Sequence, residues 1–218
     1  MDLGSLVSGT INDTLSVSLP LFRTEATLAA GMVLLLLCRM LPVLRWFDSA
    51  AVALGVAGFA AFFAWTDLQE LWQDAEFRRE LFGGLLVFDS LTAAIRFLLA
   101  AFLVLYVVFT KVSGIPDRED GADFYVLVLG GTLGMCLMAS ANHLLMVFMA
   151  VEMASVPSYA LAAILKGRKA ASEAGLKYAV YGAGAAGIML YGISLLAGVL
   201  GTCYFPSMAA ELGRLIGE

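Results

Sequence analysis

The chain has 218 residues and a net charge of −5; 61% of its residues are hydrophobic, only 14% are charged, and its mean hydropathy is +0.89. Because a soluble domain carries about 25% charged residues, this composition excludes a soluble enzyme and indicates an integral membrane protein whose surroundings are the lipid bilayer. The single histidine argues against a bis-histidine haem, and the cysteines form no zinc or iron–sulfur pattern. No nucleic acid is expected as a partner.

Six apolar stretches are long enough to cross a bilayer as helices, which takes about 20 residues each. In chain order they cover residues 24–44, 49–66, 85–112, 124–141, 143–165 and 173–200. Sheets are not expected, because in lipid only helices and closed barrels satisfy every backbone polar group, and these runs are too continuously apolar for barrel strands. The sequence therefore predicts an all-α membrane protein.

The remaining segments divide the chain further. Residues 1–23 are expected to be an external N-terminal segment; helices one to three fill 24–112, with an external connector at 67–83 that is polar and suggests an amphipathic helix. Helices four to six fill 113–200. Residues 201–218 predict an interfacial helix, and the chain would end before a seventh span. The apolar residues of that last helix fall on one face: Met208, Leu212, Leu215 and Ile216.

Basic residues are distributed unevenly between the predicted connectors. Seven lie in the connectors on one side of the predicted membrane, against four on the other side. The positive-inside rule then places the N-terminus outside the cytoplasm. Glycines also cluster within helices four and six, and Gly130 with Gly134 forms a G-x-x-x-G spacing, which predicts close helix packing.

One acidic side chain, Glu152, falls in the fifth predicted helix near the bilayer midplane. An acid at that depth costs about 2.5–3.5 kcal/mol on insertion scales, so such residues usually face a bundle interior and mark an ion path. We interpret Glu152 as a proton-transfer residue. The alternative is a glutamate locked in an interhelical hydrogen bond.

Polar groups follow Glu152 along the same helix. Pro157 lacks the N–H that would bond the carbonyl four residues earlier, and Ser155, Ser158 and Tyr159 add hydroxyls nearby. Together these groups favour water held within the bundle. The alternative is a packing kink, which is common in membrane helices.

Lys177, about one turn into the sixth predicted helix, is the second candidate for proton transfer. Counting 1.5 Å per residue from the helix ends argues against direct contact with Glu152 and favours a water-bridged route lined by Tyr178 and Tyr181. The alternative is a lysine that extends to the membrane interface.

Three further ionisable residues lie in or beside the predicted spans. Asp89 and Arg96 stand seven residues apart on one face of helix three, which suggests an internal pair with a structural role. His143 opens helix five at the external surface. It is a candidate for passing protons, but the favoured alternative is a solvated residue at a helix end.

Several of these segments resemble a known family. The run LGMCLMASANHLLMVFMAVEMASVPSYALAA at 133–163 resembles helices four and five of the antiporter-like subunits of proton-pumping NADH:quinone oxidoreductase (complex I) and of Mrp-type antiporters. Residues 169–202 are similar to the family's helix six, and 81–97 to its third-helix entry. The likeness is greatest to the N-type subunit and runs from about residue 25 onward.

The resemblance implies a fold that is the first half of an antiporter-like proton channel, in a bacterial-type inner membrane. Glu152 and Lys177 fall on the family's fifth-helix glutamate and sixth-helix lysine. It also implies other membrane-arm subunits as partners and an enzyme only at the level of the complex. The chain itself would carry no redox centre, since NADH, FMN, iron–sulfur clusters and quinone belong to partner subunits.

Family members are longer and carry a seventh-helix lysine as the usual partner of the glutamate. The sequence thus leaves three possibilities: a subunit split between two chains, a remainder outside this sequence, or a degenerate member. It also leaves two other functions open. One is an Mrp-type cation/proton antiporter or membrane-bound hydrogenase subunit, and the other is a non-transporting structural or assembly subunit.

Overall fold

The computed structural model describes residues 11–41, 48–72, 77–115, 121–165 and 168–217. Six helices in these ranges are long and apolar enough to cross a membrane, which confirms the predicted all-α membrane class. Their bounds are α2 (Arg23–Met40), α3 (Ser49–Trp72), α4 (Ser90–Ser113), α5 (Gly121–Ser140), α6 (Leu144–Ala162) and α7 (Lys169–Leu200). Shorter helical elements are η1 (Thr14–Ser18), η2 (Pro20–Phe22) and α8 (Phe205–Gly217).

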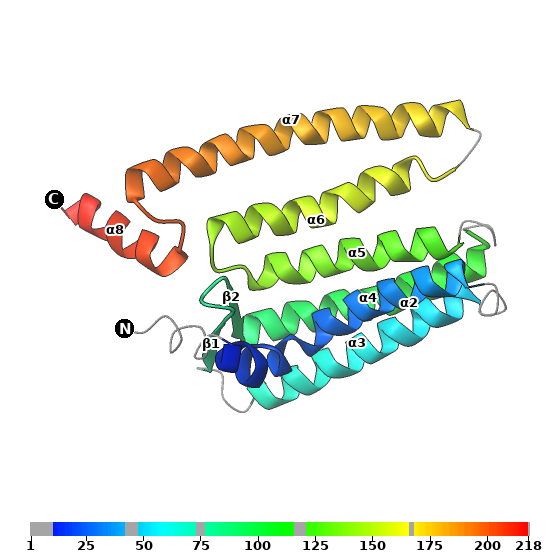
Figure 1. Cartoon of the computed structure of the whole chain (residues 1–218), viewed down its shortest axis with the longest axis horizontal. Coiled ribbons are helices and arrows are strands. Elements are labelled where there is room, and N and C mark those ends of the chain that lie inside the picture. Colours follow the sequence, from blue (N-terminus) through cyan, green and yellow to red (C-terminus); the bar gives the residue numbers. More distant parts are fainter. Residues whose placement is uncertain (1–10, 42–47, 73–76, 116–120, 166–167, 218) are drawn as a thin grey trace.

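The spanning helices form an elongated bundle (Figure 1). Helices α2, α3 and α4 pack together, α5 lies between this group and α6, and α7 lies beside α6 on the far side. Small residues make the first group tight, since a Cβ on Gly31 of α2 would lie 2.3 Å from Cγ1 of Val56 on α3. A stripe of buried alanines runs along α3: Ala53, Ala57, Ala60 and Ala64.

The connector before α4 is partly a β-hairpin, which differs from the sequence expectation of an amphipathic helix and no strands. Helix α3 continues to Trp72, strand β1 (Arg78–Leu81) pairs antiparallel with β2 (Leu86–Asp89), and α4 therefore begins later than predicted. Gly83 and Gly84, at φ +67° and +88°, turn the chain between the strands, a conformation that glycine adopts without steric cost. Strand β2 falls within the predicted third span, but in the structure the hairpin lies between the spanning helices α3 and α4, where its edges need no lipid-compatible pairing.

The helix ends beside the hairpin are held by polar caps. The Asp89 carboxylate accepts a hydrogen bond from Thr92 N at 2.8 Å and caps α4, and His143 Nδ1 accepts from Leu145 N at 3.2 Å at the start of α6. Such caps satisfy backbone N–H groups that the helix leaves unbonded. At the other end of the bundle, Gly114 takes the left-handed conformation and terminates α4.

One buried asparagine joins three segments at this end, which we call the hairpin end. The side chain of Asn142 donates to the Gly84 carbonyl at 3.3 Å, and its backbone N–H donates to Leu85 O at 2.9 Å. Its own carbonyl accepts from Phe205 N at 3.1 Å. The hairpin, the α5–α6 loop and the start of α8 are therefore connected through one residue.

Candidate functional site

Glu152 lies at the ninth position of α6 and is half-buried. At 1.5 Å per residue it is about 12 Å from the first residue of the helix and about 15 Å from the last, so it sits near mid-height of the span. Among the described residues, none donates a hydrogen bond to its carboxylate or forms an ion pair with it. Within this part of the chain, the interhelical hydrogen bond that was the alternative explanation does not form.

The helix that carries Glu152 is pressed against α5. A Cβ on Gly134 would lie 2.5 Å from the backbone N of Ala154, two residues beyond Glu152, and a Cβ on Gly130 would lie 3.6 Å from Cγ of Pro157. Only glycine allows two backbones to approach this closely. The close packing that the G-x-x-x-G spacing predicted is confirmed, and it fixes the height of the carboxylate relative to α5.

Pro157 faces the neighbouring helices. It lines a largely apolar groove of about 250 Å³ between α4, α5 and α6, together with Thr132 and Ser158. Glu152 is not among the lining residues of that groove. The proline therefore shapes packing on this side, and its predicted part in a water path to the carboxylate stays a prediction.

Hydroxyl groups near Pro157 bond locally and to α7. Ser155 Oγ donates to Val151 O at 2.7 Å, and Ser158 Oγ donates to Ser155 O at 2.6 Å and lies 3.3 Å from the Tyr178 hydroxyl. The rings of Tyr159 and Tyr178 meet edge-to-face with centroids 4.6 Å apart. The structure thus brings four predicted residues together where α6 meets α7.

A glycine of α7 makes room for this contact. A Cβ on Gly182 would lie 2.1 Å from the Tyr159 hydroxyl oxygen, and one on Gly175 would lie 2.5 Å from Cβ of Ala163. These two contacts set the register of α6 against α7. Lys177 is therefore level with the stretch between Tyr159 and Ala163.

That register separates the two proton-transfer candidates. Lys177 is seven to eleven residues along the helix axis from Glu152, which is about 10–16 Å. Its ammonium forms a 2.6 Å ion pair with Glu173, one turn earlier in α7, and 67% of its side chain is exposed. Tyr181 on the same helix is also exposed. Direct contact between Lys177 and Glu152 is excluded by this height difference, as the sequence predicted.

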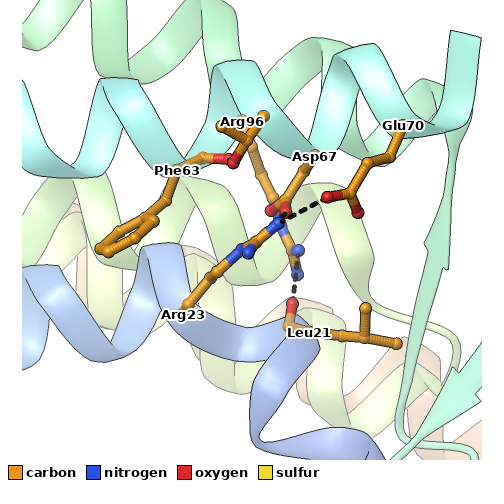
Figure 2. Close-up of polar contacts among 7 residues, drawn as sticks. Leu21, Arg23, Phe63, Asp67, Glu70 and Arg96 are labelled. Atoms are coloured by element: carbon orange, nitrogen blue, oxygen red, sulfur yellow. Dashed lines mark hydrogen bonds and ion pairs between the residues drawn. The ribbon is translucent and has the colours of Figure 1, made fainter.

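The expected pair between Asp89 and Arg96 is wrong. Asp89 caps α4, while the Arg96 side chain is completely buried, with Nε 2.6 Å from Oε1 of an equally buried Glu25 on α2. Arg96 Nη1 also donates to the Leu21 carbonyl at 3.2 Å (Figure 2). The two side chains point in different directions: Asp89 turns toward its own helix to cap Thr92 N, and Arg96 points across to α2.

Sequence reasoning missed Glu25 and its neighbour Asp67 altogether. Arg23 forms an ion pair with the buried Asp67 of α3 and lies 3.7 Å from Glu70 (Figure 2). The available signal was an acid inside the first predicted span and an arginine inside the third. Two unexplained opposite charges in the apolar layer favour each other as partners.

Comparison of the sequence with known proteins finds one matching family and several related subunits. Residues 141–216 match the family described as NADH:quinone oxidoreductase/Mrp antiporter, transmembrane. Over these residues, about a third of the chain, the sequence is similar to that family. NADH-quinone oxidoreductase subunit N 2 of Sorangium cellulosum is 34% identical, over 92% of this chain and 40% of the relative. The chain therefore spans about 40% of the length of that relative.

Chains of two solved respiratory membrane complexes have a similar fold. A chain of respiratory complex I from Thermus thermophilus, solved with bound aureothin, matches with a TM-score of 0.63 and 30% identity, over 88% of this chain and 42% of that one. A chain of the membrane-bound sulfane sulfur reductase, an archaeal respiratory complex, matches with a TM-score of 0.71 over 85% of this chain and 39% of that one. At 20% identity, the second likeness shows the fold alone.

Proposed function

We propose that this chain is part of the membrane arm of a proton-translocating NADH:quinone oxidoreductase, and that Glu152 transfers protons within it. The observation that carries the proposal is a carboxylate at mid-height of a spanning helix that has no hydrogen-bond or ion-pair partner among the described residues. Placing an acid at that depth in the membrane is energetically costly, so such a residue usually has a function or a partner on another segment.

The open side of the bundle supports a missing partner. Only 6% of the residues in the apolar windows of α6 and α7 are buried, against 56% for α5. We propose that further helices, either later in the same subunit or on a second chain, cover this side and supply a basic partner for Glu152. Other membrane-arm subunits would complete the complex, and the redox cofactors would reside outside this chain.

Lys177 enters the proposal as a second proton carrier at a different height from Glu152. Because about 10–16 Å separates the two along the helix axis, the route between them requires bridging water. The contact of Tyr159, Tyr178 and Ser158 lies beside Lys177 and provides hydroxyl groups for such a chain. We also propose that the hairpin end faces away from the cytoplasm, because the majority of the basic residues in the connectors lie at the opposite end.

Proton pumping by the assembled complex tests the proposal. Glu152→Gln is expected to lower the ratio of protons pumped to NADH oxidised several-fold, while the complex assembles in normal amount. Glu211→Gln on α8 is the matched control, because it removes a carboxylate whose ion pair is with Arg214, a neighbour on the same exposed helix. Normal pumping by an assembled Glu152→Gln complex would overturn the proposed role.

One alternative rests on the matched family, whose description includes Mrp antiporters. In that case the chain would purify with cation/proton antiporter subunits and without any NADH-oxidising partner. A mass-spectrometric inventory of the complex, purified through a tag on this chain, decides between the two. A non-transporting structural subunit would instead be indicated if Glu152→Gln lowered complex stability and left coupling unchanged.

A further inference from the structure

A second group of buried charges lies at the hairpin end, away from Glu152. Glu25 of α2 and Arg96 of α4 have no exposed side-chain surface, and Asp67 of α3 is only 1% exposed. Burying charges in an apolar bundle is expensive, and is normally accompanied by complete hydrogen bonding of every charged atom. This group, which we call the Glu25 cluster, departs from that rule.

Several atoms of the Glu25 cluster have no hydrogen-bond partner although they are buried. They are both carboxylate oxygens of Glu25, Oδ2 of Asp67, Nε and Nη2 of Arg96, and Oγ1 of Thr24. The Arg96 Nε–Glu25 Oε1 distance of 2.6 Å is an ion contact, but its angles are not those of a hydrogen bond. Apart from this ion contact, these buried donors and acceptors of Arg96, Glu25 and Asp67 form no hydrogen bonds with one another.

Water is the ligand that fits such a set. A buried water makes about three hydrogen bonds to polar groups that the protein leaves unsatisfied, and here three carboxylate oxygens of Glu25 and Asp67 and two guanidinium donors of Arg96 are in electrostatic contact with one another. A carboxylate that is solvated by water rather than locked by protein donors is also free to take a proton from that water. Oε1 of Glu25 makes the ion contact with Arg96, but Oε2 accepts no hydrogen bond and therefore points to proton binding as well as hydration.

The Glu25 cluster is connected to the exterior of the bundle by graded exposure. Glu25 and Asp67 are buried, Arg23 bonds Asp67 and is 34% exposed, and Glu70 lies 3.7 Å from Arg23 with 71% of its side chain exposed. Figure 2 shows Arg23 of α2, Asp67 and Glu70 of α3, and Arg96 of α4 converging. Polar groups thus lead stepwise from the buried acid to the surface.

We propose that Glu25 is a hydrated proton-binding site that exchanges protons with the aqueous phase at the hairpin end, past Arg23, Asp67 and Glu70. In the loading step, a water in the cluster gives a proton to a Glu25 oxygen and is reprotonated by the next water toward Glu70. No other bond is made or broken. The site is separate from Glu152, and it does not depend on the function proposed for that residue.

The charges around Glu25 allow it to exist in two states. Arg96 on α4 and the Arg23–Asp67 pair face the same space, and Cys136 of α5 is the neighbouring ionisable group from the fourth packed helix. With all four charged residues ionised, two positive charges balance two negative ones. Protonation of Glu25 leaves one net positive charge, which the exposed carboxylate of Glu70 offsets at 3.7 Å from Arg23.

Infrared difference spectroscopy tests this site directly. The full chain, purified with the subunits that accompany it, carries glutamate labelled with ¹³C at the side-chain carboxyl and is titrated with pH in H₂O and D₂O. We expect a label-shifted, deuterium-sensitive stretch of a protonated carboxyl that titrates reversibly, is lost in Glu25→Gln, and remains in Glu152→Gln. Glu70→Gln is expected to keep the band and slow its response to a pH jump.

A different pair of results would overturn the proposal. If Glu25→Gln fails to assemble, Glu25→Asp still decides, because it keeps a carboxylate beside the buried Arg96 and removes the ¹³C label from this position alone, while the exposed glutamates stay labelled. Loss of a label-shifted titrating band in Glu25→Asp supports the site. If Glu25→Asp keeps every label-shifted titrating band of the wild type, Glu25 is a permanently ionised partner of Arg96.

Discussion

Arg96 on α4 and Glu25 on α2 form an ion contact of 2.6 Å in which neither side chain is exposed. The two residues are far apart in the sequence, and their contact ties the first spanning helix to the third. The Phe88 ring, with its centroid 5.2 Å from Cζ of Arg96, adds a cation–π contact that also shields the guanidinium. If the Glu25 carboxylate is removed, the Arg96 guanidinium stays buried and cannot reach solvent.

Removing one member of the pair should therefore cost more than removing both. Glu25→Ala leaves the Arg96 guanidinium buried beside no carboxylate of its own, and should lower the free energy of unfolding by about 3–5 kcal/mol. The double variant Glu25→Leu/Arg96→Leu should lose much less, because neither charge remains. Denaturant unfolding in detergent measures both. Equal losses in the single and double variants would contradict the argument, and Glu211→Ala on exposed α8 is the control.

The spanning helices could be predicted from sequence because each corresponds to one continuous apolar stretch of the chain. A run of apolar residues such as 90–113 must be helical in lipid whatever surrounds it. The hairpin could not be predicted, since β1 reads RREL and is stabilised by pairing with β2 rather than by its own composition. The polar residues of β1 are equally compatible with an amphipathic helix or a loop.

The buried charged residues also differ in whether the sequence predicts them. Glu152 is recognisable from its position alone, because an acid in the middle of an apolar run is unusual wherever its partners are. The Arg96–Glu25 contact depends on which helices are neighbours and how they are rotated, and neither is encoded locally. The choice of Asp89 as the partner of Arg96 failed because helical spacing ignores the cap that Asp89 makes to Thr92.

Helix contact beside Glu152 should be sensitive to one methyl group. Gly134→Ala places a Cβ 2.5 Å from the Ala154 backbone N, which cannot move without shifting α6. We expect a loss of about 1–3 kcal/mol in the free energy of unfolding, as for other overpacked cores. Gly58→Ala on α3 is the matched control, because a Cβ there meets nothing within 4 Å. A Gly134→Ala protein as stable as the control would show that α6 leaves room for a methyl group at Gly134.

Lys177 and Glu173 separate a stabilising role from a transport role. Their ion pair is solvent-exposed and joins residues one turn apart, so Glu173→Gln should change the free energy of unfolding by less than about 0.5 kcal/mol. Lys177→Met breaks the same pair and also removes the proposed proton carrier. We expect normal pumping in assembled Glu173→Gln complexes and a several-fold loss in Lys177→Met. Equal pumping in both would remove Lys177 from the proton path.

The contact between Tyr204 and Glu80 should make attachment of the hairpin depend on alkaline pH. The Tyr204 hydroxyl donates to the Glu80 carboxylate, joining strand β1 to the loop before α8. This hydrogen bond raises the pKa of Tyr204 above its ordinary value of 10.0. Because the folded pKa exceeds the unfolded one, the contact stabilises fully below pH 10.0 and is lost as the pH rises through the folded value.

Thermal unfolding of wild type and Tyr204→Phe over a range of pH measures this effect. Subtracting the two melting temperatures cancels every other titrating group, so the difference reports the Tyr204–Glu80 contact alone. We expect wild type to melt higher by a constant margin below pH 10.0, with the margin shrinking toward zero above it. Tyr191→Phe on the exposed side of α7 should show no margin at any pH. A Tyr204→Phe margin that stays constant through alkaline pH would mean that the hydroxyl does not hold the hairpin.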